Sequence, residues 1–143
     1  MRASERRSVL WLLAAIVLTA GLAYAWWQTI GHWQTALYCI GRKGTVWNGL
    51  FAVPAGMKPQ CPQSPSYRQE VRDGQTRVEQ YRIQGWQPRS LIEPLKQAGF
   101  AQLEDEIEGP NHYSVFMGRN APAELFYTAV ADGQDTLITL SGK

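Results

Sequence analysis

The chain has few of the residues that build catalytic or metal sites. Its 143 residues include two histidines, His32 and His112, and two cysteines, Cys39 and Cys61. It has no Cys-x-x-Cys pair, no His-x-x-x-His pair and no glycine-rich phosphate loop, so zinc, dithiol and nucleotide chemistry are not predicted. His112 would need a nucleophile and an orienting acid to act as a general base, and Ser114 stands in no recognisable elbow. We therefore expect no enzyme activity, no catalytic or metal-binding residues, no cofactor and no small-molecule substrate.

Charge is missing from one long stretch near the amino terminus. Val9 to Trp27 has no charged residue and only Thr19 as a polar interruption. At about nineteen residues, this run nearly reaches the roughly 20 residues that a helix needs to cross the hydrocarbon core. Such a segment either anchors a protein in a membrane or directs its export and is then removed. We predict a transmembrane helix over residues 8–27, with a signal peptide over residues 1–25 as the alternative.

The signal-peptide interpretation depends on the end of this apolar run. Ala23-Tyr24-Ala25 fits the small-x-small pattern of a cleavage site, with cleavage before Trp26. The anchor interpretation is supported by the aromatic residues at both ends of the run, Trp11 at one and Tyr24, Trp26 and Trp27 at the other. Aromatic side chains are enriched at both membrane–water interfaces.

Basic residues predict the orientation of this segment. Three arginines precede the apolar run closely, whereas Arg42 and Lys43 are the first positive charges after it. Cytoplasmic flanks carry the excess of positive charge, so residues 1–7 are predicted to form a cytoplasmic tail. The expected location is the cell inner membrane, with one span and with the carboxy-terminal domain in the periplasm.

Proline is absent from residues 2–53, so the membrane helix can continue beyond the apolar run. Apolar residues recur there at spacings of four and three, as on one face of an amphipathic helix. This stripe consists of Trp26, Ile30, Trp33, Leu37 and Ile40. We predict a juxtamembrane helix over residues 28–41 and assign Ile30, Trp33 and Leu37 to contact with a partner protein. The alternative is a helix whose stripe packs on the chain's own domain.

The exported part has no net charge. The first 27 residues hold three Arg and one Glu, which leaves 14 − 3 = 11 basic and 12 − 1 = 11 acidic residues. Binding to nucleic acid, or to an anionic lipid surface mainly through charge, is therefore not expected. The distribution is uneven, with 9 − 4 = +5 over residues 42–96 and 2 − 7 = −5 over residues 97–143. The two halves neutralise each other in one fold, or they form a dipolar surface that steers a charged partner.

Cys39 and Cys61 both lie in the exported part, where an oxidising compartment favours a disulfide. The bridge would join the end of the juxtamembrane helix to the proline-rich segment 54–65. A closed loop of this size stabilises the fold by roughly 3 kcal/mol in the chain-entropy model. We predict this disulfide.

Residues 42–143 are predicted to form one small α+β domain, an antiparallel sheet with one packed helix. The expected elements are a strand within 45–53, a connector over 58–66, a hairpin of 66–72 and 75–84 around Asp73-Gly74, a helix over 90–98, and strands over 112–118, 124–131 and 136–141. Phe126 and Val130 make the second face of their strand apolar as well. Leu137 points away from Ile138 and Leu140, and the inward side of that strand is left open.

Contact with a protein partner is the function that these observations favour. We expect a single-pass envelope protein that serves as an accessory or assembly subunit of a membrane complex. Besides the helical stripe, the basic side of the expected hairpin provides three contact candidates, Arg68, Arg72 and Arg77. The alternative is a periplasmic inhibitor or immunity protein that blocks a toxin or hydrolase, which the small size and the acidic segment 104–108 suit equally well.

Overall fold

The computed structural model describes residues 3–119 and 123–143. The chain divides into two compact units, Met1–Thr35 and Ala36–Lys143. Each unit is described by itself.

The first unit is a long helix. It comprises α1 (Ala3–Trp26), a π-helical turn η1 (Trp27–Gly31) and a 3-10 turn η2 (His32–Gln34). Its apolar side chains are exposed along the length of α1, and Val17 is 72% exposed. Residues Ser4–Gln34 are long and apolar enough to cross a membrane, a property that a signal sequence shares. The predicted apolar helix is confirmed, and the small-x-small site lies within its helical backbone.

The helical backbone ends earlier than predicted. Thr35 is extended, with ψ of 159°, so the helix stops at Gln34 and does not reach Gly41. The physical reason lies in the residues that follow, because Tyr38 and Ile40 are buried in the second unit and Cys39 forms a disulfide. The apolar spacing of four and three therefore continues beyond the end of the helix.

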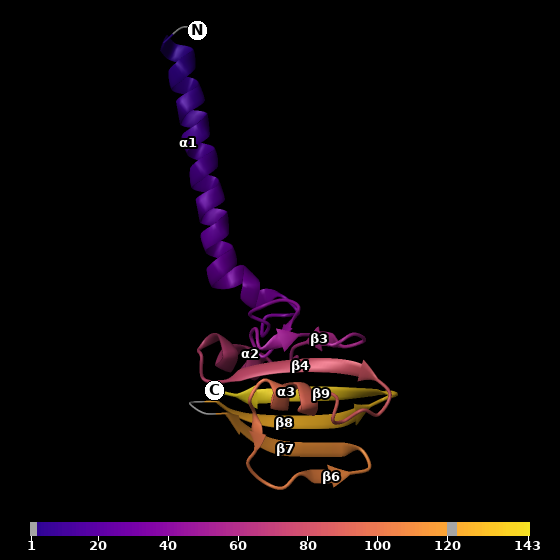
Figure 1. Ribbon diagram of the computed structural model, residues 1–143. Coiled ribbons are helices and arrows are strands. Elements are labelled where there is room, and N and C mark those ends of the chain that lie inside the picture. Colours follow the sequence, from indigo (N-terminus) through magenta and orange to yellow (C-terminus); the bar gives the residue numbers. More distant parts are fainter. Residues whose placement is uncertain (1–2, 120–122) are drawn as a thin grey trace. The chain divides into compact units, whose positions relative to one another are not determined.

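The second unit is an α+β domain (Figure 1). Its elements are β1 (Thr45–Val46), β2 (Phe51–Ala52), β3 (Lys58–Gln60), α2 (Pro65–Arg72), β4 (Arg77–Gln84), α3 (Ile92–Gln97), β5 (Ala101–Gln102), β6 (Ile107–Gly109), β7 (His112–Arg119), β8 (Ala123–Asp132) and β9 (Asp135–Gly142). Over the described residues, one seven-stranded antiparallel sheet has the order β3-β4-β9-β8-β7-β5, and β6 also pairs with β7. The small hairpin β1–β2 is separate.

Three long strands at the centre of the sheet match the sequence prediction. The strands predicted over 112–118, 124–131 and 136–141 are β7, β8 and β9. Asp132 pairs with Asp135 across the tight turn between β8 and β9, where Gly133 has φ of +65°. Glycine adopts this left-handed conformation without a steric penalty, and the turn fixes the register of both strands.

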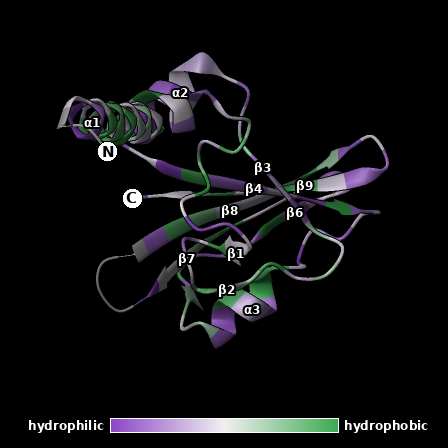
Figure 2. Ribbon diagram, turned by 90° about the horizontal axis from the view of Figure 1, so that it is seen from above, coloured by the Kyte–Doolittle hydropathy of each residue, from purple (hydrophilic) through white to green (hydrophobic). Residues whose placement is uncertain are grey.

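One face of the sheet carries the main core and is called the inner face. Strand alternation directs Tyr81, Tyr127 and Ile138 to this face, and each is fully buried. Helix α3 packs there through Leu91 and Leu95. Figure 2 shows α3 with β1 and β2 on this side of the sheet and α2 on the opposite side. The predicted packed helix is thus α3, whereas α2 is a second helix where a strand was expected.

The predicted hairpin around Asp73-Gly74 is wrong. Pro65 begins helix α2 at a position where its missing N–H costs nothing, and Asp73 ends the helix. The side chain of Gln69 donates to the Asp73 carboxylate at 2.9 Å, an i, i+4 contact that a strand cannot make. Gly74, with φ of +70°, terminates the helix instead of forming a hairpin turn. Only β4, the second half of the expected hairpin, is a strand.

Two other segments differ in detail from the prediction. The single strand expected within 45–53 is the hairpin β1–β2, because Trp47 and Asn48 both have positive φ, at 50° and 53°. The connector expected over 58–66 contains β3, which pairs with β4. The predicted disulfide between Cys39 and Cys61 is confirmed and fastens this segment.

Candidate functional site

The polar side chains that could take part in chemistry are held by hydrogen bonds within the fold. His112 Nε2 is 3.3 Å from Ser114 Oγ, which is the pairing of a base with a hydroxyl. The Ser114 side chain is only 4% exposed, and among the described residues no carboxylate hydrogen-bonds the His112 ring. Within residues 3–119 and 123–143, no group of three or more His, Cys, Asp or Glu side chains is placed to hold a metal ion. The Ser114 hydroxyl is therefore buried against the exposed His112 ring, and the contact is a structural hydrogen bond of β7.

Glu79 is a carboxylate buried on the inner face. Its oxygens accept the backbone N–H groups of Trp47 and Asn48 at 2.5 and 3.0 Å, and the Tyr81 hydroxyl at 2.5 Å. Burial raises the pKa of Glu79, although these three donors favour the charged form. The same burial, together with the neighbouring Glu79, raises the pKa of the Tyr81 phenol. Glu79 thus holds the β1–β2 turn on the sheet.

The acidic segment 104–108 is tied to the domain. Arg89 Nη2 lies 2.5 Å from Glu106 and 2.8 Å from Glu108. The Tyr113 hydroxyl donates to Glu106 at 2.7 Å, and burial together with this carboxylate raises the pKa of Tyr113 to about 12. Part of the charge that suggested a solvent-facing acidic patch is therefore neutralised within the fold.

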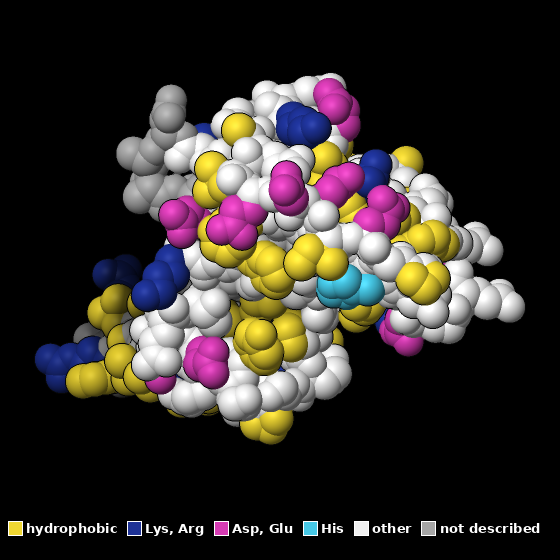
Figure 3. Space-filling view, turned by 90° about the horizontal axis from the view of Figure 1, so that it is seen from below, with side chains coloured by type: hydrophobic (Ala, Val, Ile, Leu, Met, Phe, Trp, Pro, Cys, Tyr) yellow, Lys and Arg dark blue, Asp and Glu magenta, His cyan; other side chains and the backbone are white. Residues whose placement is uncertain are grey.

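Within the described residues of the second unit, the second face of the sheet, called the outer face, carries exposed apolar side chains over β7 and β8. Phe116 pairs with Phe126 across these strands, with ring centroids 5.8 Å apart. Val130 pairs with Leu137 two rows further along, and Phe126 and Val130 remain 40% and 37% exposed. Figure 3 views the domain onto the β6 edge of the sheet, where hydrophobic side chains lie at the middle of the edge and acidic ones along one side of it. Exposed apolar residues that cluster in this way mark surfaces for protein contact.

A hydroxyl-bearing row separates the two apolar rows of the outer face. Ser114, Thr128 and Thr139 stand at one level of β7, β8 and β9, and Gln80 of β4 donates to Thr139 at 3.1 Å. These small hydroxyl side chains separate the phenylalanine pair from the pair of Val130 with Leu137.

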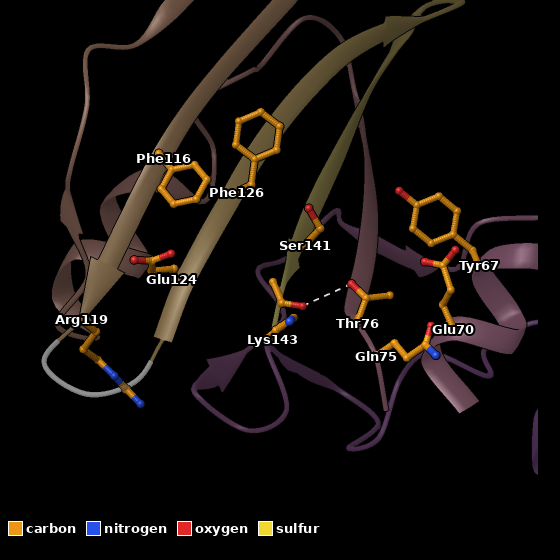
Figure 4. Close-up of a pocket in the computed structure, with 11 residues that line it drawn as sticks. Tyr67, Glu70, Gln75, Thr76, Phe116, Arg119, Glu124, Phe126, Ser141 and Lys143 are labelled. Atoms are coloured by element: carbon orange, nitrogen blue, oxygen red, sulfur yellow. Dashed lines mark hydrogen bonds between the residues drawn. The ribbon is translucent and has the colours of Figure 1, made fainter. Parts of the chain in front are cut away.

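A hollow of about 810 Å³ opens at the phenylalanine end of the outer face. Figure 4 shows Phe116 and Phe126 on one side of it and Tyr67 and Glu70 of α2 on the other, with Ser141 between them. Four charged residues stand at its border, namely Glu70, Arg119, Glu124 and Lys143. Within the described part of the chain, none of these four forms an ion pair, and Arg119 lies over the Phe100 ring at 5.3 Å. The hollow combines an aromatic wall with two charges of each sign.

The predicted contact residues of the helical stripe are dispersed. Ile30 is exposed and Trp33 half-buried in the first unit, where Trp33 stacks edge-on with His32 at 5.2 Å. Leu37 belongs to the second unit and is half-buried. Their role in partner contact stays a prediction.

The predicted basic contact residues do not form one cluster. Arg68 and Arg72 are one turn apart on α2, and Arg68 lies 4.4 Å above the Tyr38 ring. Arg77 begins β4 and its guanidinium lies over Trp47, a residue of the inner-face core. Arg77 therefore lies on a different element from the other two, and the role of all three in partner contact stays a prediction.

The sequence already contained the signal for the outer face. This signal is carried by Phe126 and Val130, which make the second face of their strand apolar, and by Leu137, which points away from Ile138 and Leu140. The sequence does not show which face of the sheet is covered. Only the fold shows that α3 packs on the inner face and not over β7 and β8 on the outer face.

Comparison with known proteins gives no relative. No protein-family model matches the chain, and neither a curated protein nor a solved structure matches it. The function is therefore inferred from the surface of the described chain.

Proposed function

We propose that the chain is a single-pass envelope protein whose exported domain acts by protein–protein contact, as an accessory or assembly subunit of a membrane complex. The observation that carries this proposal is the outer face with its exposed Phe126 and Val130. Monomeric soluble proteins rarely leave such a cluster of apolar side chains uncovered unless it binds a partner. The mixed charges at the border of the hollow fit a protein partner better than a uniformly charged ligand.

The anchored, periplasm-facing arrangement has separate support. An apolar helix whose side chains are exposed along its length needs lipid around it, and its helical backbone runs through Ala23–Ala25 without a break. The three arginines before this helix favour a cytoplasmic amino terminus in the inner membrane. The Cys39–Cys61 disulfide favours an oxidising compartment, the periplasm, for the domain.

A single substitution on the outer face tests the proposal. Full-length tagged protein is extracted in mild detergent, and its partners are quantified for the wild type, for Phe126→Asp and for Trp86→Asp. Trp86 is 39% exposed, close to the 40% of Phe126, but it lies in the connection from β4 to α3. A charge at the centre of an interface should weaken partner binding by about tenfold or more. We expect stoichiometric membrane partners to be lost with Phe126→Asp and retained with Trp86→Asp.

Unfolding must be distinguished from lost contact in this experiment. The melting temperatures of both variants should stay close to that of the wild type, since both side chains are exposed. If Phe126→Asp unfolds the domain, Phe126→Ser is the milder substitution at the same position. Equal recovery from all variants would show that the outer face is not the contact surface. Recovery of one foreign toxin or hydrolase in place of membrane partners would favour the periplasmic inhibitor over the assembly subunit.

A further inference from the structure

We propose that the outer face binds a second copy of the same chain, so that the protein forms a two-fold dimer in its membrane. The inference rests on the proposed function, because it names the partner of the same contact surface. It follows from the shape, the register and the charges of that surface.

The outer face has a raised side, where α2 lies, and a low side over β7 and β8, and the two are complementary in shape. Helix α2 stands on the outer side of the sheet and provides Tyr67 and Glu70 to one wall of the hollow (Figures 2 and 4). Strands β8 and β7 form the opposite wall, and in the described part of the second unit no helix packs over them. Consider a two-fold axis that lies above the outer face, parallel to the strands and between β8 and β9. A half-turn about this axis stacks the outer faces of two copies and exchanges the side with α2 for the side without it. It brings α2 of each copy over the bare β7–β8 region of the other, where the exposed Tyr67 meets the phenylalanine pair.

The strand register defines what meets at the centre of this dimer. Because β8 and β9 flank the axis, Val130 of one copy faces Leu137 of the other, and Thr128 faces Thr139. The first contact joins apolar side chains, and the second joins hydroxyls that can both donate and accept. A two-fold interface brings a patch against the same patch of the other copy after a half-turn, and a central patch without charge does so without repulsion between like charges.

The charges at the border become paired in the same arrangement. The register joins Leu125 with Gly142, so Glu124 and Lys143 are the next pair outward on β8 and β9. The half-turn therefore sets Glu124 of each copy against Lys143 of the other. It also carries Glu70 on α2 towards Arg119 at the end of β7. The four border charges that form no ion pair within the described chain thus gain partners of opposite sign.

The size of the face suits a weak dimer that depends on the membrane. Three strands of about eight residues cover roughly 27 by 15 Å, or about 400 Å² per copy before α2 is added. Stable interfaces bury about 800 Å² per partner. Confinement of both copies to one membrane raises their effective concentration and favours association through a face of this size.

Thiol cross-linking in vesicles tests the dimer. Full-length Val130→Cys is placed in phospholipid vesicles and treated with a bismaleimide of about 10 Å span, the spacing of two stacked sheets. The native cysteines are bonded to each other and do not react. We expect a cross-linked dimer from Val130→Cys and none from Glu93→Cys, an exposed site on α3 beside the inner face. A dimer from neither variant, or from both equally, would overturn the proposal.

A charge exchange tests the geometry. In the Val130→Cys background, Glu124→Lys and Lys143→Glu should each reduce the cross-linked fraction severalfold, and the double variant should restore it. Failure of the double variant to recover would refute the stated half-turn. If Phe126→Asp abolishes binding of other membrane partners while no self-cross-link forms, the proposed function stands and the dimer does not.

Discussion

Glu79 is an acid in the core, 1% exposed, and its neighbours explain how the fold accommodates it. Trp47 and Asn48 take the left-handed conformation, which directs two successive N–H groups at one point. In water these groups would bind solvent, but here the Glu79 carboxylate accepts both. Successive backbone N–H groups in a turn form a concave anion site, and in this protein the anion belongs to the chain itself.

Glu79 should make the stability of the domain depend on pH. Burial raises its pKa in the folded state above the ordinary 4.5, so the folded protein holds the proton more tightly than the unfolded chain does. Its contribution to the free energy of unfolding is then complete below the unfolded pKa and is lost as the pH rises through the folded pKa. We expect the stability advantage of the wild type over Glu79→Gln to be larger at about pH 4 than at about pH 8. Chemical denaturation at both pH values measures it, and an advantage that grows with pH would contradict the prediction.

Single residues also show the limit of alternation as a guide. Val78, on the outer-face side of β4, is buried as completely as Tyr81, whereas Phe126 on the same side of β8 is 40% exposed. The pattern of apolar residues predicts which side chains share a face. It does not predict which part of that face another element covers, and this is why the outer face was not predicted as a site.

Helix α2 shows how local signals compete at the scale of an element. Asp73-Gly74 fits both a hairpin turn and the end of a helix, because each needs a glycine with positive φ. Pro65 at the first helical position favoured the helix, but the alternation of polar and apolar residues favoured the strand. Segment 65–72 is short, and over eight residues an apolar period of two is difficult to distinguish from one of 3.6.

The segment between the two cysteines should depend on their bond. The bridge closes a loop with a sequence separation of 22 residues, which contains β1, β2 and β3. We expect the double variant Cys39→Ser and Cys61→Ser to lower the free energy of unfolding by about 2–4 kcal/mol. Dithiothreitol should lower the wild type by a similar amount and leave the double variant unchanged. Equal stability of oxidised and reduced wild type would show that the bond adds nothing.

At the scale of the whole molecule, the anchor interpretation predicts the covalent state of the mature protein. Intact mass measured on protein from the membrane fraction should include the first 25 residues. Ala25→Phe, which removes the small residue that a signal peptidase needs, should leave the mature mass unchanged apart from the substitution. A mature chain that begins at Trp26 would end the anchor interpretation, as would accumulation of a longer form only in Ala25→Phe.

The coarse architecture was predictable from the sequence because it depends on strong, long patterns. The uninterrupted apolar run gave the first helix, and the turn at Gly133 with its flanking strands gave β8 and β9. Short elements such as β3, β5 and β6 were not predictable, since two or three residues carry no period and their pairing depends on tertiary contacts. The hollow beside α2 required the helix to be known first, so its border charges could not be assembled from the sequence.

The disulfide also determines how the domain would bear mechanical load. If the first helix is held in a membrane and a bound partner pulls on the sheet, tension enters the domain at Ala36 and reaches Cys39 three residues later. From there a covalent path leads through the bridge to Cys61 and onward towards β4, and bypasses the segment with β1, β2 and β3. That segment, which includes the turn held by Glu79, stays unloaded while the bond is intact. Reduction would place it in series with the tether and lengthen the reach of the domain by up to roughly 70 Å of extended chain.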